Sequence, residues 1–219
     1  MYYFNRFSVV KKSLMAAGLA VAVSACAAGG GSGADSGFWN DVKNDRASAI
    51  TQDISQGADP NAVNENGEPA LIQAIRDQSL SVFDALVDNP KTKVDAVNRT
   101  NETPLMYIAI IGDVPRAKKL VARGAKVNRL GWTPLHYAAS KGHTDMVEYL
   151  LGKGAYPNAP APDGSSPLLM AVTSKNADAV RALVKAGADP RAINQKNVSA
   201  LDMARKMGNN DVIQALNAK

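Results

Sequence analysis

Apolar residues along most of the chain recur at the spacing of one helix face, in short runs separated by turn residues. Met146, Val147 and Leu150 lie three and four positions apart, and Val180 and Leu183 continue the pattern further along. This spacing predicts short amphipathic helices. Each run covers only a few turns, so a single helix pair cannot bury its own apolar face. Neighbouring pairs are therefore expected to stack.

A seven-residue motif marks the start of alternate runs. Residues 133–139 (TPLHYAA) match residues 103–109 (TPLMYIA) and 166–172 (SPLLMAV), and residues 69–71 and 199–201 match more loosely. The leucines that mark the five copies are 34, 30, 33 and 33 residues apart, at Leu71, Leu105, Leu135, Leu168 and Leu201. A period of this length is typical of a repeat architecture.

A second motif, Gly-Ala followed by Pro two residues later or by Asn three residues later, precedes four of the copies, starting at Gly57, Gly124, Gly154 and Gly187. Together the two motifs and their period resemble the ankyrin repeat over about residues 45–218. The resemblance implies an all-α solenoid of helix-turn-helix units joined by β-hairpin fingers. It implies about five repeats, with a degraded N-terminal cap over residues 38–61.

The motif residues also have local physical reasons. Thr or Ser caps a helix N-terminus, and Pro suits the first turn, where its missing N–H would be unpaired. Gly112 and Gly142 are expected to end first helices in a left-handed conformation. Two fingers depart from the pattern: the third, before Leu135, is three residues shorter, and the second has Lys91-Thr92 in place of Gly-Ala.

The N-terminal residues have the layout of an export signal. Residues 1–25 carry three basic residues and then an uncharged apolar run, which predicts a signal peptide. Residues 23–26 (VSAC) resemble the bacterial lipobox, which implies that Cys26 receives a lipid. The alternative is an ordinary cleaved signal with an incidental cysteine. Residues 26–37 are mainly Ala, Gly and Ser and predict a flexible tether, which leaves residues 38–219 as the repeat domain.

The formal charge of +5 and the pI near 9.3 first suggest a nucleic-acid partner. Without residues 1–25 the chain keeps 22 basic and 20 acidic residues, so the repeat domain is close to neutral. We therefore expect no nucleic-acid partner. The single cysteine excludes an internal disulfide and a multi-cysteine metal site.

No motif for catalysis or nucleotide binding is present. The chain has no Gly-x-Ser-x-Gly elbow and no glycine-rich phosphate loop. His136 and His143 lie at positions where ankyrin repeats commonly carry histidine, so the resemblance implies a structural role rather than a metal pair. We expect no enzymatic activity, no cofactor, no metal and no small-molecule substrate.

In the ankyrin family, partners usually contact the fingertips and the exposed side of the first helices, which together form a concave face. Carried over to this sequence, the concave face is expected to include Arg76, Arg99, Glu102, Ile110, Ile111, Leu130, Trp132, Ser140, Lys141, Ser165 and Lys206. Trp132 is the strongest candidate because tryptophan is enriched among residues that dominate binding energy. Either it forms an apolar patch with Leu130, Ile110 and Ile111, or it only packs on the adjacent finger.

These features predict a protein-binding module in the bacterial cell envelope. A lipid on Cys26 would anchor it to the membrane, facing the periplasm, and Ala27 rather than Asp after the cysteine favours the outer membrane. The expected partner is a periplasmic or envelope protein. An alternative within the same class is an immunity or inhibitor protein that neutralises a toxin or hydrolase in the periplasm.

Overall fold

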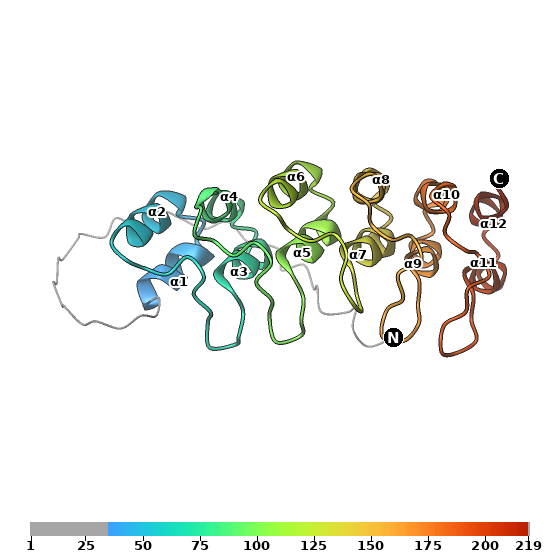
Figure 1. The fold of residues 1–219 in the computed structure, drawn as a ribbon, viewed down its shortest axis with the longest axis horizontal. Helices are drawn as coiled ribbons and strands as arrows, with labels where there is room; N and C mark the ends of the chain where they lie inside the picture. Colours follow the sequence, from blue (N-terminus) through green and yellow to red (C-terminus); the bar gives the residue numbers. More distant parts are fainter. Residues whose placement is uncertain (1–34, 219) are drawn as a thin grey trace, which may run out of the picture. The chain divides into compact units, whose positions relative to one another are not determined.

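The computed structural model describes residues 35–218, which form twelve α-helices in six pairs (Figure 1). The predicted signal peptide, Cys26 and most of the predicted tether lie outside these residues. None of the twelve helices is long and apolar enough to cross a membrane. The helices are α1 (Ser36–Lys43), α2 (Ala47–Ser55), α3 (Ala70–Arg76), α4 (Leu80–Asp88), α5 (Pro104–Ile111), α6 (Val114–Ala122), α7 (Pro134–Lys141), α8 (Thr144–Gly152), α9 (Pro167–Ser174), α10 (Ala177–Lys185), α11 (Ala200–Met207) and α12 (Asn210–Asn217).

The predicted all-α solenoid is confirmed. Helices α1 and α2 form the N-terminal unit, and repeats 1 to 5 are the successive pairs from α3–α4 to α11–α12. Each first helix of a repeat contacts the first helix of the next, and the second helices do the same. Two parallel rows result, with the fingers extending from the row of first helices (Figure 1). One continuous core runs from Phe38 to Leu216.

Hydroxyl side chains begin the first helices as the motif predicts. The Oγ atoms of Thr103, Ser166 and Ser199 accept the backbone N–H three residues later, at 3.4, 3.2 and 3.1 Å. The α1 helix begins at Ser36, two residues before the predicted domain boundary at Phe38. Asp35 explains the earlier start, since its Oδ1 accepts the Phe38 N–H at 2.9 Å and satisfies an otherwise unpaired donor.

A left-handed residue ends most of the first helices. Gly112 and Gly142 have φ of 76° and 68°, which confirms the expectation from the sequence. Lys175 occupies the same position after α9 with φ of 63°, and Gln78 does so after α3 with φ of 61°. Residues other than glycine rarely adopt this backbone conformation, so the backbone is strained at Lys175 and Gln78.

The fingers are tight hairpin turns with little strand pairing. Isolated antiparallel bridges join Val63 to Pro69 and Ile193 to Ser199, and residues 35–218 contain no longer strand. Asn98 closes the second finger because its Oδ1 accepts the N–H groups of Thr100 and Glu102 at 3.0 and 2.9 Å. Asn64 and Asn194 do the same in the first and fifth fingers.

Asparagines at the base of three fingers join each repeat to the next. The Nδ2 of Asn61, Asn128 and Asn158 donates to a backbone carbonyl of the following repeat at 3.0, 2.7 and 2.8 Å. The Oδ1 of each accepts an N–H from that same repeat. The second finger departs from the motif here as well, since Asp95 takes this place and accepts the N–H of Lys126.

Candidate protein-binding face

The fingers extend from the row of first helices (Figure 1), and the predicted concave face is the side that these helices and fingers border. Most of the predicted face residues are accessible there. Six are exposed, namely Arg76, Arg99, Ile111, Leu130, Lys141 and Lys206. Glu102, Trp132 and Ser140 are half-buried. Leu130 is 96% exposed at the tip of the shortened third finger, which is a high value for so large an apolar side chain.

Two of the predicted face residues are buried, and for these the prediction was wrong. Ile110 is 8% exposed because its branched apolar side chain packs into the core, whereas Arg76 at the equivalent position of α3 is exposed. Ser165 is 2% exposed, and its backbone carbonyl lies 3.1 Å from His136 Nε2 of the preceding repeat. Ile110 therefore adds no exposed surface to the apolar patch expected beside Trp132, whereas Ile111 and Leu130 are exposed.

Glu102 is the centre of a hydrogen-bond network that joins repeats 2 and 3. Its Oε2 accepts from Tyr107 Oη at 2.7 Å, and its Oε1 accepts from Tyr137 Oη at 2.7 Å. Asn98 Nδ2 and Thr100 Oγ1 also donate to Oε2, at 3.0 and 2.9 Å. Glu102 therefore braces the face as well as lining it.

The network continues into repeat 1 through Arg76. Its guanidinium donates to Glu68 Oε2 at 2.8 Å and to Tyr107 Oη at 3.4 Å, and it lies 5.9 Å from the Tyr107 ring centroid. Sequence reasoning missed Tyr107 and Tyr137. The signal was present, because both tyrosines follow the motif leucine by two residues, and these positions face Glu102 once the repeats stack.

Burial and hydrogen bonding fix the protonation states in this network. Burial alone would raise the pKa of Glu102, but hydrogen bonds from Asn98, Tyr137, Tyr107 and Thr100 outweigh it and lower that pKa. Burial and the hydrogen bond to Glu102 raise the pKa of Tyr107 and of Tyr137. At neutral pH the carboxylate is therefore charged and both phenols remain donors.

Trp132 packs on its own repeat while remaining partly accessible. Its ring meets His136 edge-on with centroids 5.3 Å apart, and Tyr137 with centroids 6.3 Å apart. The indole joins the edge of the core there. Its neighbour Leu130, in contrast, extends into solvent. The third finger therefore presents one almost fully exposed apolar side chain, Leu130, close in sequence to the partly exposed Trp132.

The two histidines brace neighbouring repeats, as the sequence predicts. His136 is fully buried; its Nδ1 accepts the Thr133 N–H at 3.2 Å, and its Nε2 lies 3.1 Å from the Ser165 carbonyl. Burial lowers the pKa of His136 to about 4, so the ring is neutral at pH 7. His143 Nε2 lies 2.9 Å from the Ile110 carbonyl. No group of three or more potential metal ligands occurs within residues 35–218.

A depression of about 590 Å³ lies at the N-terminal end of the concave face. Trp39 and Lys43 of α1 line one side, and residues 63–66 of the first finger line another. Gln73 and Asp77 of α3 complete the lining. Sequence reasoning missed this feature because Trp39 belongs to the degraded unit, where the repeat pattern gives no position for it.

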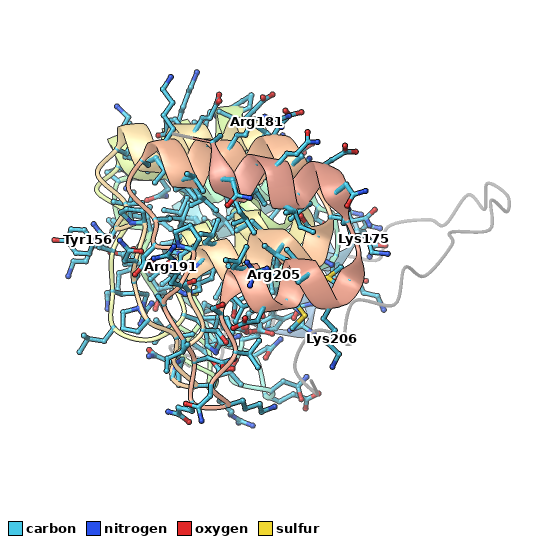
Figure 2. The ribbon with its side chains drawn as sticks, turned by 90° about the vertical axis from the view of Figure 1, so that its right-hand side faces the viewer. Tyr156, Lys175, Arg181, Arg191, Arg205 and Lys206 are labelled. Atoms are coloured by element: carbon cyan, nitrogen blue, oxygen red, sulfur yellow. The ribbon has the colours of Figure 1, made fainter. Side chains whose placement is uncertain are left out.

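The C-terminal repeats carry lysines at the ends of their first helices. Lys141 is in the last turn of α7, Lys175 follows α9, and Lys206 is in the last turn of α11. All three are exposed. Figure 2 shows Lys175 and Lys206 on the same side of the repeats, with Tyr156 and Arg191 on the opposite side.

The stacked helix pairs and fingers define a helical-repeat scaffold. Models of ankyrin repeats match residues 40–128, 81–161 and 163–195, so the chain belongs to the ankyrin repeat family. Ankyrin repeats are generally protein–protein interaction modules, and their fold is typically a scaffold without catalytic activity. No curated protein sequence matches the chain.

Two solved structures show the same architecture. An ankyrin repeat domain from Acinetobacter baumannii is 26% identical with a TM-score of 0.73, over 83% of this chain and 96% of that one. The human ASB11 ankyrin repeat domain is also 26% identical with a TM-score of 0.73, over 84% of this chain and 83% of that one.

Proposed function

We propose that this protein is a lipid-anchored binding module of the bacterial envelope, which holds or protects a periplasmic or envelope protein on its concave face. The observation that carries the proposal is Leu130, which is almost fully exposed beside Trp132 on a face that hydrogen bonds hold rigid. An exposed apolar side chain on a preorganised surface favours binding, because little conformational freedom is lost on association.

Site-specific photo-cross-linking tests the binding face in cells. A photoreactive amino acid at Leu130 or Ser140 is expected to capture the same protein, which mass spectrometry would identify. The matched control is Arg181, which is exposed on the row of second helices (Figure 2). Equal products from all three positions, or none from the concave face, would contradict the proposal. If the captured protein is a secreted toxin or hydrolase, the function would be to neutralise that toxin or hydrolase.

The anchor rests on the lipobox resemblance around Cys26 and is tested separately. Metabolic labelling with an alkyne fatty acid is expected to mark the wild-type protein but not Cys26→Ala, and globomycin should block maturation of the wild type. Fractionation should place the wild type in the outer membrane. A Cys26→Ala protein that stays in the membrane fraction would contradict the proposed lipid anchor.

A further inference from the structure

One position in each of the five fingers carries an exposed apolar side chain. Over residues 35–218, six large apolar side chains are exposed, and four of them occupy this position, where they are between 43% and 96% exposed. The position is the sixth residue after the glycine of the Gly-Ala motif, or after Lys91 where that motif is replaced. An exposed proline occupies it in the fourth finger. We call this set the finger stripe; its members are Val63, Val97, Leu130, Pro160 and Ile193.

The hairpins make these positions structurally equivalent in fingers 1, 2, 4 and 5. In each of them, the residue after the stripe residue donates its backbone N–H to the carbonyl four positions further on. The donors are Asn64, Asn98, Ala161 and Asn194, at 3.0, 3.2, 2.9 and 3.1 Å. Finger 3 lacks three residues, so Leu130 belongs to the stripe by its distance from Gly124 rather than by this bond.

Successive fingers also meet at all four junctions, so the stripe continues along the repeat domain. Hydrogen bonds from arginine form the first two junctions, and residues near the tips of fingers 3 to 5 form the others. The junctions bring together Arg99 and Glu65, Arg129 and Asn101, Gly131 and Pro162, and Gln195 and Asp163.

The stripe lies between the fingertips and the row of first helices. Val63 lines the depression at the N-terminal end of the concave face together with Gln73 and Asp77 of α3. Equivalent positions in a repeat array face the same way, so the other stripe residues are on the concave side as well. The turns at the fingertips follow the stripe in the chain, at residues 65–67 in the first finger and 195–197 in the fifth.

The stripe repeats one chemistry, whereas the helix row opposite it does not. In four of the five fingers an alanine precedes the stripe residue and an asparagine or alanine follows it, so its chain neighbours are uncharged. In finger 3 the neighbour Arg129 donates to Asn101 of the preceding finger. On the first helices, by contrast, one repeat position carries side chains as different as Arg76, Ile110 and Lys206.

Resting on the proposed function, we propose that the finger stripe binds an extended, uncharged, apolar segment of the partner, such as a protein exposes before it folds. Apolar side chains on both sides leave water when they meet, which favours association. A segment shifted by one repeat meets the same chemistry, so recognition tolerates changes in sequence. Five fingers roughly 10 Å apart span roughly 40 Å, which corresponds to about 12 extended residues.

A polypeptide fits the stripe better than a lipid bilayer does. The fingertip turns carry exposed charged residues, including Glu65, Arg99 and Lys196. A bilayer that approached the fingers would have to remove these charges from water before it reached the stripe. An extended chain can lie between the tips and the helices, where Val63 borders the depression.

A fluorescent peptide with the sequence Gly-Ser-Leu-Gly-Ser-Ile-Gly-Ser-Val-Gly-Ser-Leu provides the probe. Fluorescence anisotropy with the full-length protein in phosphatidylcholine liposomes, corrected with protein-free liposomes, is expected to show at least tenfold tighter binding than for a peptide with Asn at each apolar position. The affinity should change little as salt rises, because no charge is paired. A shuffled peptide of the same composition should bind within about threefold, and a tenfold loss would overturn the sequence-tolerant mode.

Variants of the protein locate the binding. The stripe variant Val97→Thr, Leu130→Asn and Ile193→Thr keeps similar shapes but removes apolar surface, and it should bind the apolar peptide at least tenfold more weakly. The conservative variant Val97→Ile, Leu130→Met and Ile193→Val should bind like the wild type. Tyr156→Asn is the control, because it removes an exposed apolar side chain outside the stripe. Equal binding of the two peptides by the wild type, or an equal loss in Tyr156→Asn, would overturn the proposal.

An environment-sensitive fluorescent amino acid in place of Val97 reports what covers the stripe. In liposomes without peptide its emission should be that of a water-exposed group, and the apolar peptide should shift it to shorter wavelength. The same amino acid in place of Tyr156 should not respond. Emission that is already shifted without peptide, and quenched by spin-labelled lipid, would overturn the choice of a polypeptide.

Cross-linking in cells distinguishes this proposal from the function on which it rests. A photoreactive amino acid at Ser140 is placed in the wild type and in the stripe variant, and the expected result is that only the wild type captures the partner. If the stripe variant captures the same protein to the same extent, the binding module stands and the apolar segment is wrong. If Ser140 captures nothing in the wild type, the binding module itself is wrong.

Discussion

At the scale of single residues, His136 shows how a polar side chain can be fully buried with both ring nitrogens close to hydrogen-bond partners. Its two ring nitrogens face Thr133 and the Ser165 carbonyl, so both have partners while the ring is neutral. The Thr133 Oγ1 also lies 2.9 Å from Nδ1. Burial disfavours the charged imidazolium and lowers the pKa of His136, so the repeat interface favours the neutral imidazole.

This predicts a specific pH dependence of stability. The pKa of His136 falls from 6.5 in the unfolded chain to about 4 in the fold. The unfolded state thus binds the proton first, and stability is lost as the pH falls from about 6.5 to 4, by about 3 kcal/mol in total. Urea unfolding of the wild type across this range should show the loss, and His136→Asn should remove most of it. Parallel pH curves for both proteins would contradict the assignment.

Residue environments also explain which parts of the concave face the sequence could not predict. Periodicity places Arg76, Ile110 and Thr173 at equivalent positions, but the polar Arg76 and Thr173 are exposed whereas the apolar Ile110 is buried. Ser165 precedes its helix cap and is buried, and its backbone carbonyl lies against His136 of the preceding repeat. The sizes of neighbouring side chains decide such burial, and a repeat pattern does not report them.

At the scale of elements, the helix ends depend on how closely the next repeat approaches. A Cβ at Gly112 would lie 2.8 Å from the His143 ring, whereas a Cβ at Gly208 would have nothing within 4 Å. Both glycines have positive φ, at 76° and 63°. The first glycine is therefore required by conformation and by space, and the second by conformation alone.

We expect Gly112→Ala to destabilise the protein by about 2–3 kcal/mol. About 1 kcal/mol comes from the left-handed conformation, and the remainder from displacing His143 and its hydrogen bond to the Ile110 carbonyl. Gly208→Ala is the control and should cost about 1 kcal/mol. Chemical denaturation of both variants measures the difference, and equal losses would show that His143 moves aside without cost.

The helices could be predicted from the sequence because the Thr-Pro-Leu motif and the Gly-Ala motif recur in the same order in most repeats. The Thr or Ser caps, the prolines after them and the glycines that end the helices each specify a boundary locally. The contacts between fingers have no such signal. Arg99, for example, reaches back from the second finger to donate to the Glu65 carbonyl at 2.9 Å, which requires both fingers to be placed first.

At the scale of the whole repeat domain, each unit is stabilised by its neighbours. The first helices of repeats 1 to 4 pack against a first helix on both sides, whereas α1 and α11 have one on one side only within the described residues. Stability in such arrays is approximately the sum of the repeats and the interfaces between them. A substitution that destabilises a middle repeat should therefore also destabilise the repeats on both sides of it. A substitution that destabilises the last repeat should affect only that repeat and its neighbour.

Two core substitutions test this expectation. Leu135 in α7 is fully buried and Leu216 in α12 is 4% exposed, so replacing either with Ala removes a buried side chain and costs about 2–5 kcal/mol locally. Hydrogen–deuterium exchange with mass spectrometry should show that Leu135→Ala lowers protection in α5 and α9 as well as in α7. Leu216→Ala should lower protection in α10, α11 and α12 while α3 to α7 keep theirs. If Leu216→Ala instead lowered protection equally in every repeat, the domain would unfold as one cooperative unit. A substitution at either end would then also destabilise the concave face.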